Sequence, residues 1–318
     1  MRLLTLLARR LGAGVLLVVG ASVVLFALVD LAPGDPVLAR FGFQAASLTE
    51  ADLARLREQY GLDDPLPVRY ADFVADVAHG DLGTSARSGT PVTTLLTQTF
   101  PVTLSLTVIA AQSAATMALL FGTTAAVLRG RWPDRVVVAV SALALAAPVF
   151  WVGLLAIDLL AIRLGWLPPG GYVPLSAGVW PWLSSLLMPG ITLGIGVGAV
   201  LTRVVRASVA EQLDQDYVRT ALGSGLSPAR VLVRNVLPNA LTAPLTVFGL
   251  YVGYILAGAL PVEVLYALPG MGQLLVNAAL EGDYSVTRVV ALVTIAVFLL
   301  VNLCTDVATL ALSPLSRA

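Results

Sequence analysis

Six long apolar runs constrain the fold of this chain more than any other feature of its sequence. They lie at about residues 11–31, 101–128, 136–160, 183–203, 240–262 and 288–312. Each is long enough to cross a hydrocarbon layer of about 30 Å as a helix, which takes about 20 residues. Because lipid offers backbone groups no hydrogen-bond partners, such runs are expected to be helical. The pattern predicts an all-α, polytopic membrane protein with six transmembrane helices.

The composition agrees with this class and excludes several kinds of chemistry. Of the 318 residues, 58% are hydrophobic and 12% are charged, against about 25% charged in ordinary soluble domains. All 19 basic residues are Arg, so the chain has no Lys for a phosphate-binding P-loop or for Schiff-base chemistry. With Cys304 and His79 as its single Cys and His, it cannot form an internal disulfide or a Cys/His zinc site. We expect no cofactor bound by this chain and an exposed His79.

The distribution of Arg predicts the orientation. If the N-terminus is cytoplasmic, the cytoplasmic stretches contain twelve Arg and four acidic residues, whereas residues 33–98 contain five Arg and nine acidic residues. Cytoplasmic loops of membrane proteins carry an excess of basic residues. Both termini are therefore predicted to be cytoplasmic, and residues 33–98 to lie outside.

The chain is expected to have three parts: an N-terminal tail and first span at 1–32, an external helical cap at 33–98, and a core of five spans at 99–318. In the cap, Thr49 to Asp52 has the form of a capping box that starts one helix. A second helix is predicted over 67–79, ending before Gly80.

Small residues recur every four positions in two of the spans. They are Gly190, Gly194 and Gly198 in the fourth span, and Gly249, Gly253 and Ala257 in the fifth. Such faces let helix backbones approach closely. We interpret them as packing surfaces, with a direct role in lining the pore as the alternative.

Polar residues within the spans do not form a catalytic pattern. Asp158 and Asp306 lie near span ends, where the cost of a charge is smaller than at the bilayer centre. A proton relay or an intramembrane enzyme would need several such groups together. Neither an intramembrane enzyme nor a carrier that works without ATP is favoured by the sequence.

Residues 204–239 form a polar, Arg-rich segment between two apolar runs. A helical pattern covers about 207–223, and Gly225 follows as a residue suited to the left-handed conformation. Ser227 can then cap a second helix whose first residue is Pro228. The sequence predicts two helices joined by a glycine turn on the cytoplasmic side.

This segment resembles the cytoplasmic motif of permeases from binding-protein-dependent ABC importers. The matching residues are Arg219-Thr-Ala221, Gly225 and Asn235-Val-Leu-Pro238. Further stretches resemble the peptide and nickel branch of that family, in order along nearly the whole chain: Leu31-Ala-Pro-Gly-Asp-Pro36, Tyr60-Gly-Leu-Asp-Asp-Pro-Leu-Pro-Val68, Gly80-Asp-Leu-Gly-Thr-Ser85, Leu167-Pro-Pro-Gly170, Val262-Glu-Val264, Leu268-Pro-Gly-Met-Gly272 and Asp283-Tyr-Ser285. The nearest resemblance is to the first-permease type of the dipeptide and oligopeptide systems.

The resemblance implies a type I ABC importer permease fold and a transport subunit rather than an enzyme. Its implied partners are a second homologous permease, two ATPase subunits that hold ATP and Mg²⁺, an extracytoplasmic binding protein and membrane lipid, with no nucleic acid. The residues implied to contact an ATPase or shape the contact are Asp216, Tyr217, Arg219, Thr220, Ala221, Gly225, Leu226, Ser227 and Pro228.

The implied location is the bacterial cytoplasmic membrane, and the implied cargo is a di- or oligopeptide. Nickel or a metal–chelator complex remains the alternative, because cargo is selected by the binding protein. Whether the second permease is a different chain or another copy also stays open.

Overall fold

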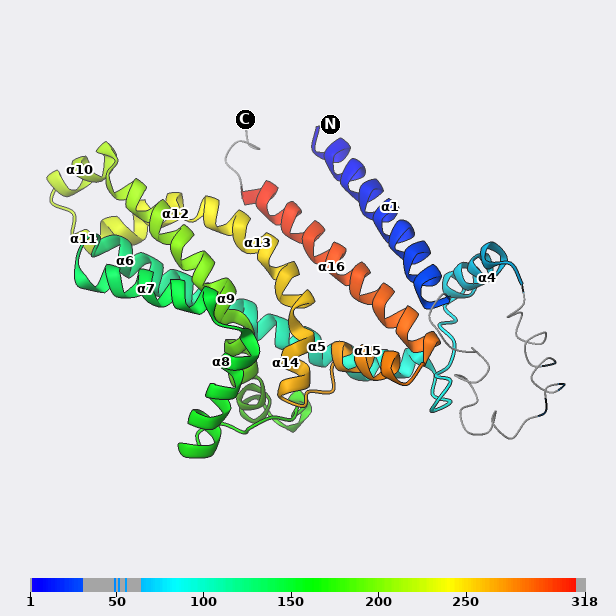
Figure 1. Ribbon diagram of the computed structural model, residues 1–318. Coiled ribbons are helices and arrows are strands. Elements are labelled where there is room, and N and C mark those ends of the chain that lie inside the picture. The colour runs from blue at the N-terminus through cyan, green and yellow to red at the C-terminus, as the bar shows by residue number, and fades with distance from the viewer. Residues whose placement is uncertain (1, 31–48, 50, 52–54, 56–63, 313–318) are drawn as a thin grey trace. The chain divides into compact units, whose positions relative to one another are not determined.

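The protein is described here by a computed structural model that covers residues 2–30, 49, 51, 55 and 64–312 (Figure 1). Regular structure in this part of the chain is helical, apart from an isolated bridge between Thr84 and Pro91. The chain divides into two compact units, residues 1–102 with 269–299 and residues 103–268 with 300–318. Most of the helix expected after Thr49 falls outside the described residues.

The first unit contains α1 (Arg2–Asp30), α4 (Leu66–Ala78), α15 (Met271–Leu280) and the first parts of α5 (Val92–Met117) and α16 (Tyr284–Leu312). Helix α4 confirms the helix predicted over 67–79, and Gly80 follows it with φ +84°. Phe26 of α1 is buried, with its ring centroid 5.5 Å from that of Tyr70 and 5.6 Å from that of Phe73. Aromatic contacts of this kind hold α1 against α4.

Two motifs that are far apart in the sequence meet in the first unit. The hydroxyl of Ser85 donates a hydrogen bond of 2.5 Å to Oδ2 of the buried Asp283. Asp283 also accepts a hydrogen bond from the backbone N–H of Val286 at the start of α16. The same unit contains an apolar cluster made by Val92, Met271, Ala278, Val286, Val289 and Val290. The two motifs therefore act in the fold as a buried polar junction.

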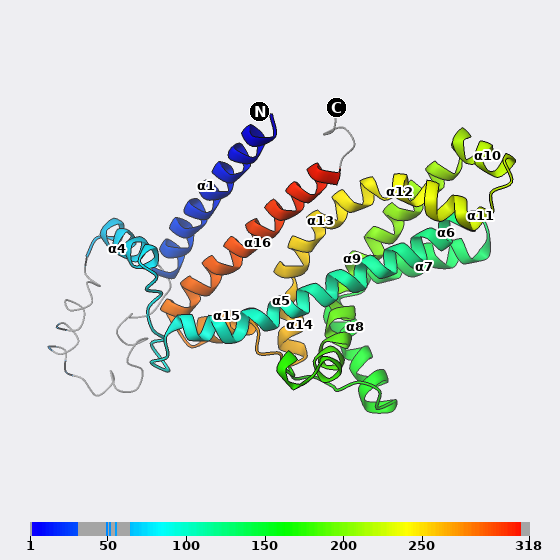
Figure 2. The same ribbon diagram turned by 180° about the vertical axis from the view of Figure 1, so that it is seen from behind.

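The second unit is built around α9 (Val179–Leu213). This helix contacts η2 (Ala118–Gly122), α6 (Thr123–Val127), α7 (Trp132–Ala146), α8 (Val149–Ala156), α12 (Leu237–Ala240), α13 (Thr242–Ala257) and α14 (Ala259–Leu265). Figures 1 and 2 show α6, α7 and α9 side by side from opposite directions. A π-helical η3 (Ile157–Arg163) continues α8, and a short η4 (Leu175–Ala177) precedes α9.

Three glycines of α9 face α5 at very close range. A Cβ added to Gly190 would lie 2.5 Å from Cγ2 of Ile109, and one added to Gly194 would collide with Ser113 and the carbonyl of Ala110. At Gly198 the nearest atom would be the sulfur of Met117, at 3.1 Å. These positions let the two backbones approach as larger residues could not.

The apolar run at 136–160, predicted as one span, is not one straight helix. It is divided between α7 and the α8–η3 helix, whose axes differ by 109°. Ala147 is extended with ψ 129°, and Pro148 follows at the start of α8. A proline disfavours helical conformation in the residue before it, which accounts for the break.

The run at 240–262 is also interrupted. Helix α13 ends at Ala257, and α14 begins after Gly258. Pro261 lacks the N–H that would bond to the carbonyl of Ala257 in a continuous helix, so the helix is weakest at this point. In α14, Glu263 is fully buried and accepts a hydrogen bond of 2.5 Å from Oγ1 of Thr103.

Two more motifs are brought together around Tyr266, just after α14. Its carbonyl accepts a hydrogen bond of 2.8 Å from the N–H of Gly171, and its hydroxyl lies 2.8 Å from Oγ1 of Thr192 in α9. A Cβ at Gly170 would collide with the backbone of Tyr266. The loop around Leu167-Pro-Pro-Gly170 is thereby fixed to the α14 end.

Within the described residues, three helices are long and apolar enough to cross a membrane, or five if each bent pair counts as one span. The three are Val92–Val127, Val179–Leu213 and Tyr284–Cys304. Helix α1 contributes a shorter apolar stretch, Gly12–Leu28. The fold is thus all-helical with several candidate spans, and the total of six stays a prediction.

Candidate functional site

The candidate site is the polar segment between α9 and α13. It contains α10 (Asp216–Gly223), α11 (Pro228–Val231), η5 (Leu232–Val236) and α12. The helix predicted over about 207–223 is wrong in its start, because α9 runs on to Leu213 and a separate helix begins at Asp216. Gln215 is extended with ψ 149°, and Asp216 lies in the first turn of α10. An acidic residue there is favoured by the partial positive charge of a helix N-terminus.

Gly225 ends α10 as predicted. It has φ +84°, and its N–H donates to the carbonyl of Leu222 at 3.0 Å. The N–H of Leu226 donates to the carbonyl of Ala221 at 3.3 Å. This pair of hydrogen bonds is the Schellman arrangement, which needs a residue tolerant of the left-handed conformation at its turn.

The start of α11 is also confirmed in its backbone. Pro228 is the first helical residue, and the preceding Ser227 has ψ 143°. The carbonyl of Ser227 accepts the N–H of Val231 at 3.0 Å. The hydroxyl of Ser227, however, makes no capping hydrogen bond, so this helix starts through its backbone and Pro228 rather than through a side-chain cap.

One face of the segment is anchored in the core of the second unit. Val218, Val231 and Val236 are at most 3% exposed and belong to an apolar cluster that includes Val205 and Val209 of α9. Ala221 and Leu226 pack against the same cluster and are partly buried. Two of the residues implied to surround the ATPase contact therefore serve mainly to attach the segment to α9.

The other face of α10 is exposed and polar. Arg219 and Asp216 form an ion pair of 3.6 Å with side chains 75% and 97% exposed, an arrangement that contributes little to stability. The hydroxyl of Tyr217 donates to Oε1 of Gln212 at 2.9 Å, and that of Thr220 donates to the carbonyl of Asp216. These four side chains are thus available to a partner without disturbing the core.

The two ends of the segment are held together. The hydroxyl of Ser208 in α9 donates a hydrogen bond of 2.6 Å to the carbonyl of Ala240 at the end of α12. Arg129, in the turn between α6 and α7, forms an ion pair of 3.0 Å with Asp214 at the end of α9. The segment therefore leaves the bundle and returns to it at a fixed place.

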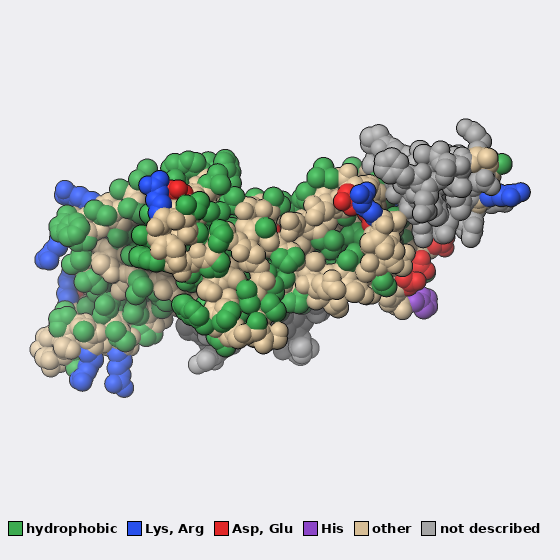
Figure 3. Space-filling view, turned by 90° about the horizontal axis from the view of Figure 1, so that it is seen from below, with side chains coloured by type: hydrophobic (Ala, Val, Ile, Leu, Met, Phe, Trp, Pro, Cys, Tyr) green, Lys and Arg blue, Asp and Glu red, His purple; other side chains and the backbone are tan. Residues whose placement is uncertain are grey.

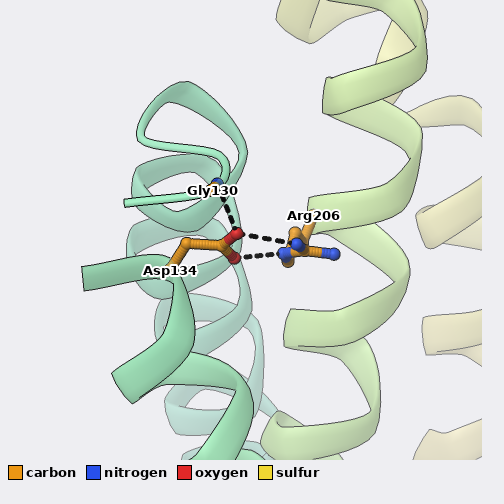
Figure 4. A network of polar contacts seen from close by, with 3 residues as sticks. All are labelled: Gly130, Asp134 and Arg206. Atoms are coloured by element: carbon orange, nitrogen blue, oxygen red, sulfur yellow. Dashed lines mark hydrogen bonds and ion pairs between the residues drawn. The ribbon is translucent and has the colours of Figure 1, made fainter. Parts of the chain in front are cut away.

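A bidentate ion pair joins α9 to α7. Arg206 donates from Nε to Oδ1 of Asp134 at 2.5 Å and from Nη2 to Oδ2 at 2.8 Å, and Asp134 also accepts the N–H of Gly130 (Figure 4). The Asp134 side chain is 5% exposed and that of Arg206 is 31% exposed. Sequence analysis predicted no specific role for either residue, since a pairing across 72 positions leaves no local pattern.

Arg side chains gather at the end of the second unit where α10, α11 and the α6–α7 turn lie (Figure 3). The exposed ones in this region are Arg129, Arg131, Arg135, Arg219, Arg230 and Arg234. In the described part of the chain, no group of three or more His, Cys, Asp or Glu could hold a metal ion.

The predicted packing glycines of the fifth span lie within α13. Gly249 and Gly253 are both buried, and α13 contacts α9. Their burial is compatible with a packing role, as is the close approach of Gly190, Gly194 and Gly198 to α5.

Solved structures resemble this fold. A chain of the MetNI methionine ABC transporter, in inward-facing conformations, matches with a TM-score of 0.57 and 16% identity, covering 69% of this chain and 96% of that one. A likeness at this identity concerns the fold alone, and it agrees with an ABC importer permease fold.

Curated relatives match nearly end to end. A probable peptide ABC transporter permease of Sinorhizobium fredii is 36% identical over 97% of this chain and 98% of its own length. The di/tripeptide transport system permease protein DppB of Pseudomonas aeruginosa is 37% identical over 96% of both chains. The glutathione transport system permease protein GsiC of Pectobacterium atrosepticum is 36% identical over 93% of both.

Two family descriptions match this chain. Residues 3–107 match the N-terminal part of binding-protein-dependent transport system membrane components, and residues 118–317 match the inner membrane component itself. Members are transport subunits that work with an ATPase and a binding protein rather than enzymes. The chain therefore belongs to the family of binding-protein-dependent transport system inner membrane components and is a multi-pass permease subunit of an ABC importer.

Proposed function

We propose that this permease forms half of the translocation pore of an ATP-driven peptide importer. Relatives that match nearly end to end are named as permeases for peptides, di/tripeptides and glutathione, which are all peptide-like cargoes. A second homologous permease completes the pore, two ATPase subunits hold ATP and Mg²⁺, and an extracytoplasmic binding protein delivers the cargo. Both termini are cytoplasmic in this proposal, following the distribution of Arg.

The ATPase contact is proposed at α10 and the turn to α11. The observation that carries this is the two-sided character of α10: Val218 is buried against the α9 cluster, while Tyr217, Arg219 and Thr220 are exposed. A subunit that docks on the exposed face can move the segment as a body. Because Val218 and Val231 pack on α9, that motion passes to a candidate span, as rocking between inward- and outward-open states requires.

The contact can be tested with Arg219→Glu and Gly225→Asp in the complete transporter. Charge reversal at Arg219 should abolish a complementary contact with the ATPase, and an Asp at φ +84° should deform the turn. We expect each variant to lower co-purification of the ATPase and uptake by tenfold or more. Co-purification and uptake of cargo into proteoliposomes with internal ATP are the measurements.

Arg234→Glu is the matched control. Arg234 is exposed and lies in η5, outside α10, and its substitution changes the net charge by the same amount as Arg219→Glu. It should retain assembly and uptake. Full assembly and uptake in both test variants would contradict the docking role of α10. Equal losses in the control would indicate a general effect of charge rather than a contact.

The cargo is tested separately with the transporter and its cognate binding protein. Uptake of radiolabelled di- and oligopeptides is expected, and uptake of nickel or a nickel–chelator complex in their place would contradict the proposed cargo. The permease reconstituted alone should transport none of these, because it has no ATPase. Uptake by the chain alone would instead indicate a carrier that works without ATP.

A further inference from the structure

The corner between α6 and α7 exposes a mixed cationic and aromatic surface. Arg131 precedes α7, Trp132 is its first residue, and Arg135 lies almost one turn further on. All three side chains are exposed, and Trp132 is 75% exposed. A large aromatic side chain beside two guanidinium groups is an unusual surface for solvent alone, and it suggests a ligand with both anionic and apolar parts.

The acidic group of this corner is directed away from that surface. At about 100° per residue, Asp134 lies about 160° around α7 from Trp132, whereas Arg135 lies only about 60° from it. Asp134 is held inward by Arg206 and Gly130 (Figure 4). The neighbouring Arg129 is paired with Asp214, while among the residues that the structure describes no ion pair within 4.0 Å involves Arg131 or Arg135. In the described part of the chain, the positive charges of Arg131 and Arg135 on the outer face therefore have no acidic partner.

An exposed apolar stripe continues from Trp132 along the same face of α7. Val136, Val140 and Leu143 are 48%, 57% and 70% exposed, and they follow Trp132 at intervals of four, four and three residues. Helix α7 is half of a bent pair with the composition of a membrane span. Trp is favoured at the boundary between hydrocarbon and headgroups, and Arg can extend its charged end toward the headgroups.

We propose that Arg131, Trp132 and Arg135 bind the headgroup of an anionic phospholipid, with its acyl chains along Val136 and Val140. Guanidinium groups recognise phosphate oxygens through paired, charge-assisted hydrogen bonds. The apolar stripe argues for a lipid rather than a soluble anion or a protein partner, since the acyl chains match a surface directly continuous with the cationic group. This site is separate from the exposed face of α10 and does not depend on the proposed cargo or ATPase contact.

The test uses the full-length permease in detergent, titrated with phosphatidylglycerol or phosphatidylcholine and followed by native mass spectrometry. Phosphatidylglycerol should bind more tightly than phosphatidylcholine. The double variant Arg131→Gln/Arg135→Gln should bind it about 30-fold more weakly, as expected for two basic groups near an anionic headgroup. Trp132→Ala should weaken the binding of both lipids, because the aromatic ring can contact either headgroup.

Arg230→Gln/Arg234→Gln is the matched control, with the same loss of two exposed charges in α11 and η5. It should keep the affinity for phosphatidylglycerol, and unchanged thermal midpoints in both doubles would show intact folds. Equal weakening in the two doubles would overturn the site in favour of general electrostatic attraction. Glycerol phosphate that binds as tightly as the lipid would overturn it in favour of a soluble anion.

Discussion

The two neighbouring apolar segments α9 and α7–α8 respond differently to proline. Helix α9 continues for 35 residues with Pro189 in its interior, whereas α7 and the α8–η3 helix meet at 109° beside Pro148. In α9, fifteen residues are buried, including Pro189. In α7 and α8 together, three are buried: Asp134, Ser141 and Gly153.

The difference teaches that burial on several sides can hold a helix through a residue that would otherwise interrupt it. Met188, which precedes Pro189, stays helical while 1% exposed, and Gly190 lies directly against Ile109 of α5. Ala147, which precedes Pro148, has no such enclosure and takes the extended conformation that proline favours in the residue before it. Packing thus offsets a local cost of about 3 kcal/mol in one segment and not in the other.

The largest expected effect comes from breaking the ion pair between Asp134 of α7 and Arg206 of α9. Asp134→Ala leaves Arg206 without its bidentate partner and removes the hydrogen bond from Gly130. We expect about 2–3 kcal/mol of destabilisation, reduced from the value for a fully buried pair because Arg206 is 31% exposed. Chemical denaturation in detergent, followed by circular dichroism, measures it.

Asp158→Ala supplies the control for that change. Asp158 pairs with Arg163 at 2.8 Å inside η3, with side chains 47% and 69% exposed. Its loss should cost less than about 1 kcal/mol. Similar costs at the two sites would show that the α7–α9 ion pair has no special part in holding these helices together.

A smaller effect, of opposite sign at two positions, is expected from glycines within α9. Gly194→Ala should destabilise by about 1–3 kcal/mol, because the added methyl group meets Ser113 and the carbonyl of Ala110. Gly196→Ala meets nothing within 4 Å and should stabilise by up to about 1 kcal/mol through its helix propensity. Thermal unfolding of both variants checks the sign, and stabilisation by Gly194→Ala would refute the close packing of α9 on α5.

The smallest effect addresses the prolines themselves. Pro189→Ala restores a helical hydrogen bond but removes buried atoms, so we expect a net stabilisation of about 1 kcal/mol. Pro148→Ala removes the restriction that proline places on the backbone of Ala147. The unfolded chain then gains conformational entropy, so the variant should be less stable by about 0.5–1 kcal/mol. The same thermal measurement compares them, and destabilisation by both would contradict the view that α9 is held against its own proline.

The sequence predicted the positions of the apolar helices well, because long apolar runs are a strong and local signal. It also predicted the end of α10 and the start of α11, since Gly225 and Pro228 each act on their own backbone. It did not predict the bend at Ala147 or the start of α10 at Asp216. The bend depends on which residues are enclosed by other helices, and apolar character is the same on both sides of it.

The candidate site shows the same division between local and distant effects. The polar segment and its turn were evident from residue types, whereas the inward position of Ala221 and Leu226 depends on packing against α9. The pairing of Asp134 with Arg206 joins residues 72 positions apart, and a single sequence holds no record of such contacts.

The hydrogen bond from Ser208 to the carbonyl of Ala240 has a consequence for how such a permease can diversify. Since the polar segment begins and ends at one fixed place, its outward side chains can be exchanged without repacking the helices that carry cargo. Under the proposed docking role of α10, recognition of the ATPase and passage of the cargo can then change independently of each other. A transplanted segment that keeps Val218 and Val231 should let one membrane domain work with a foreign ATPase.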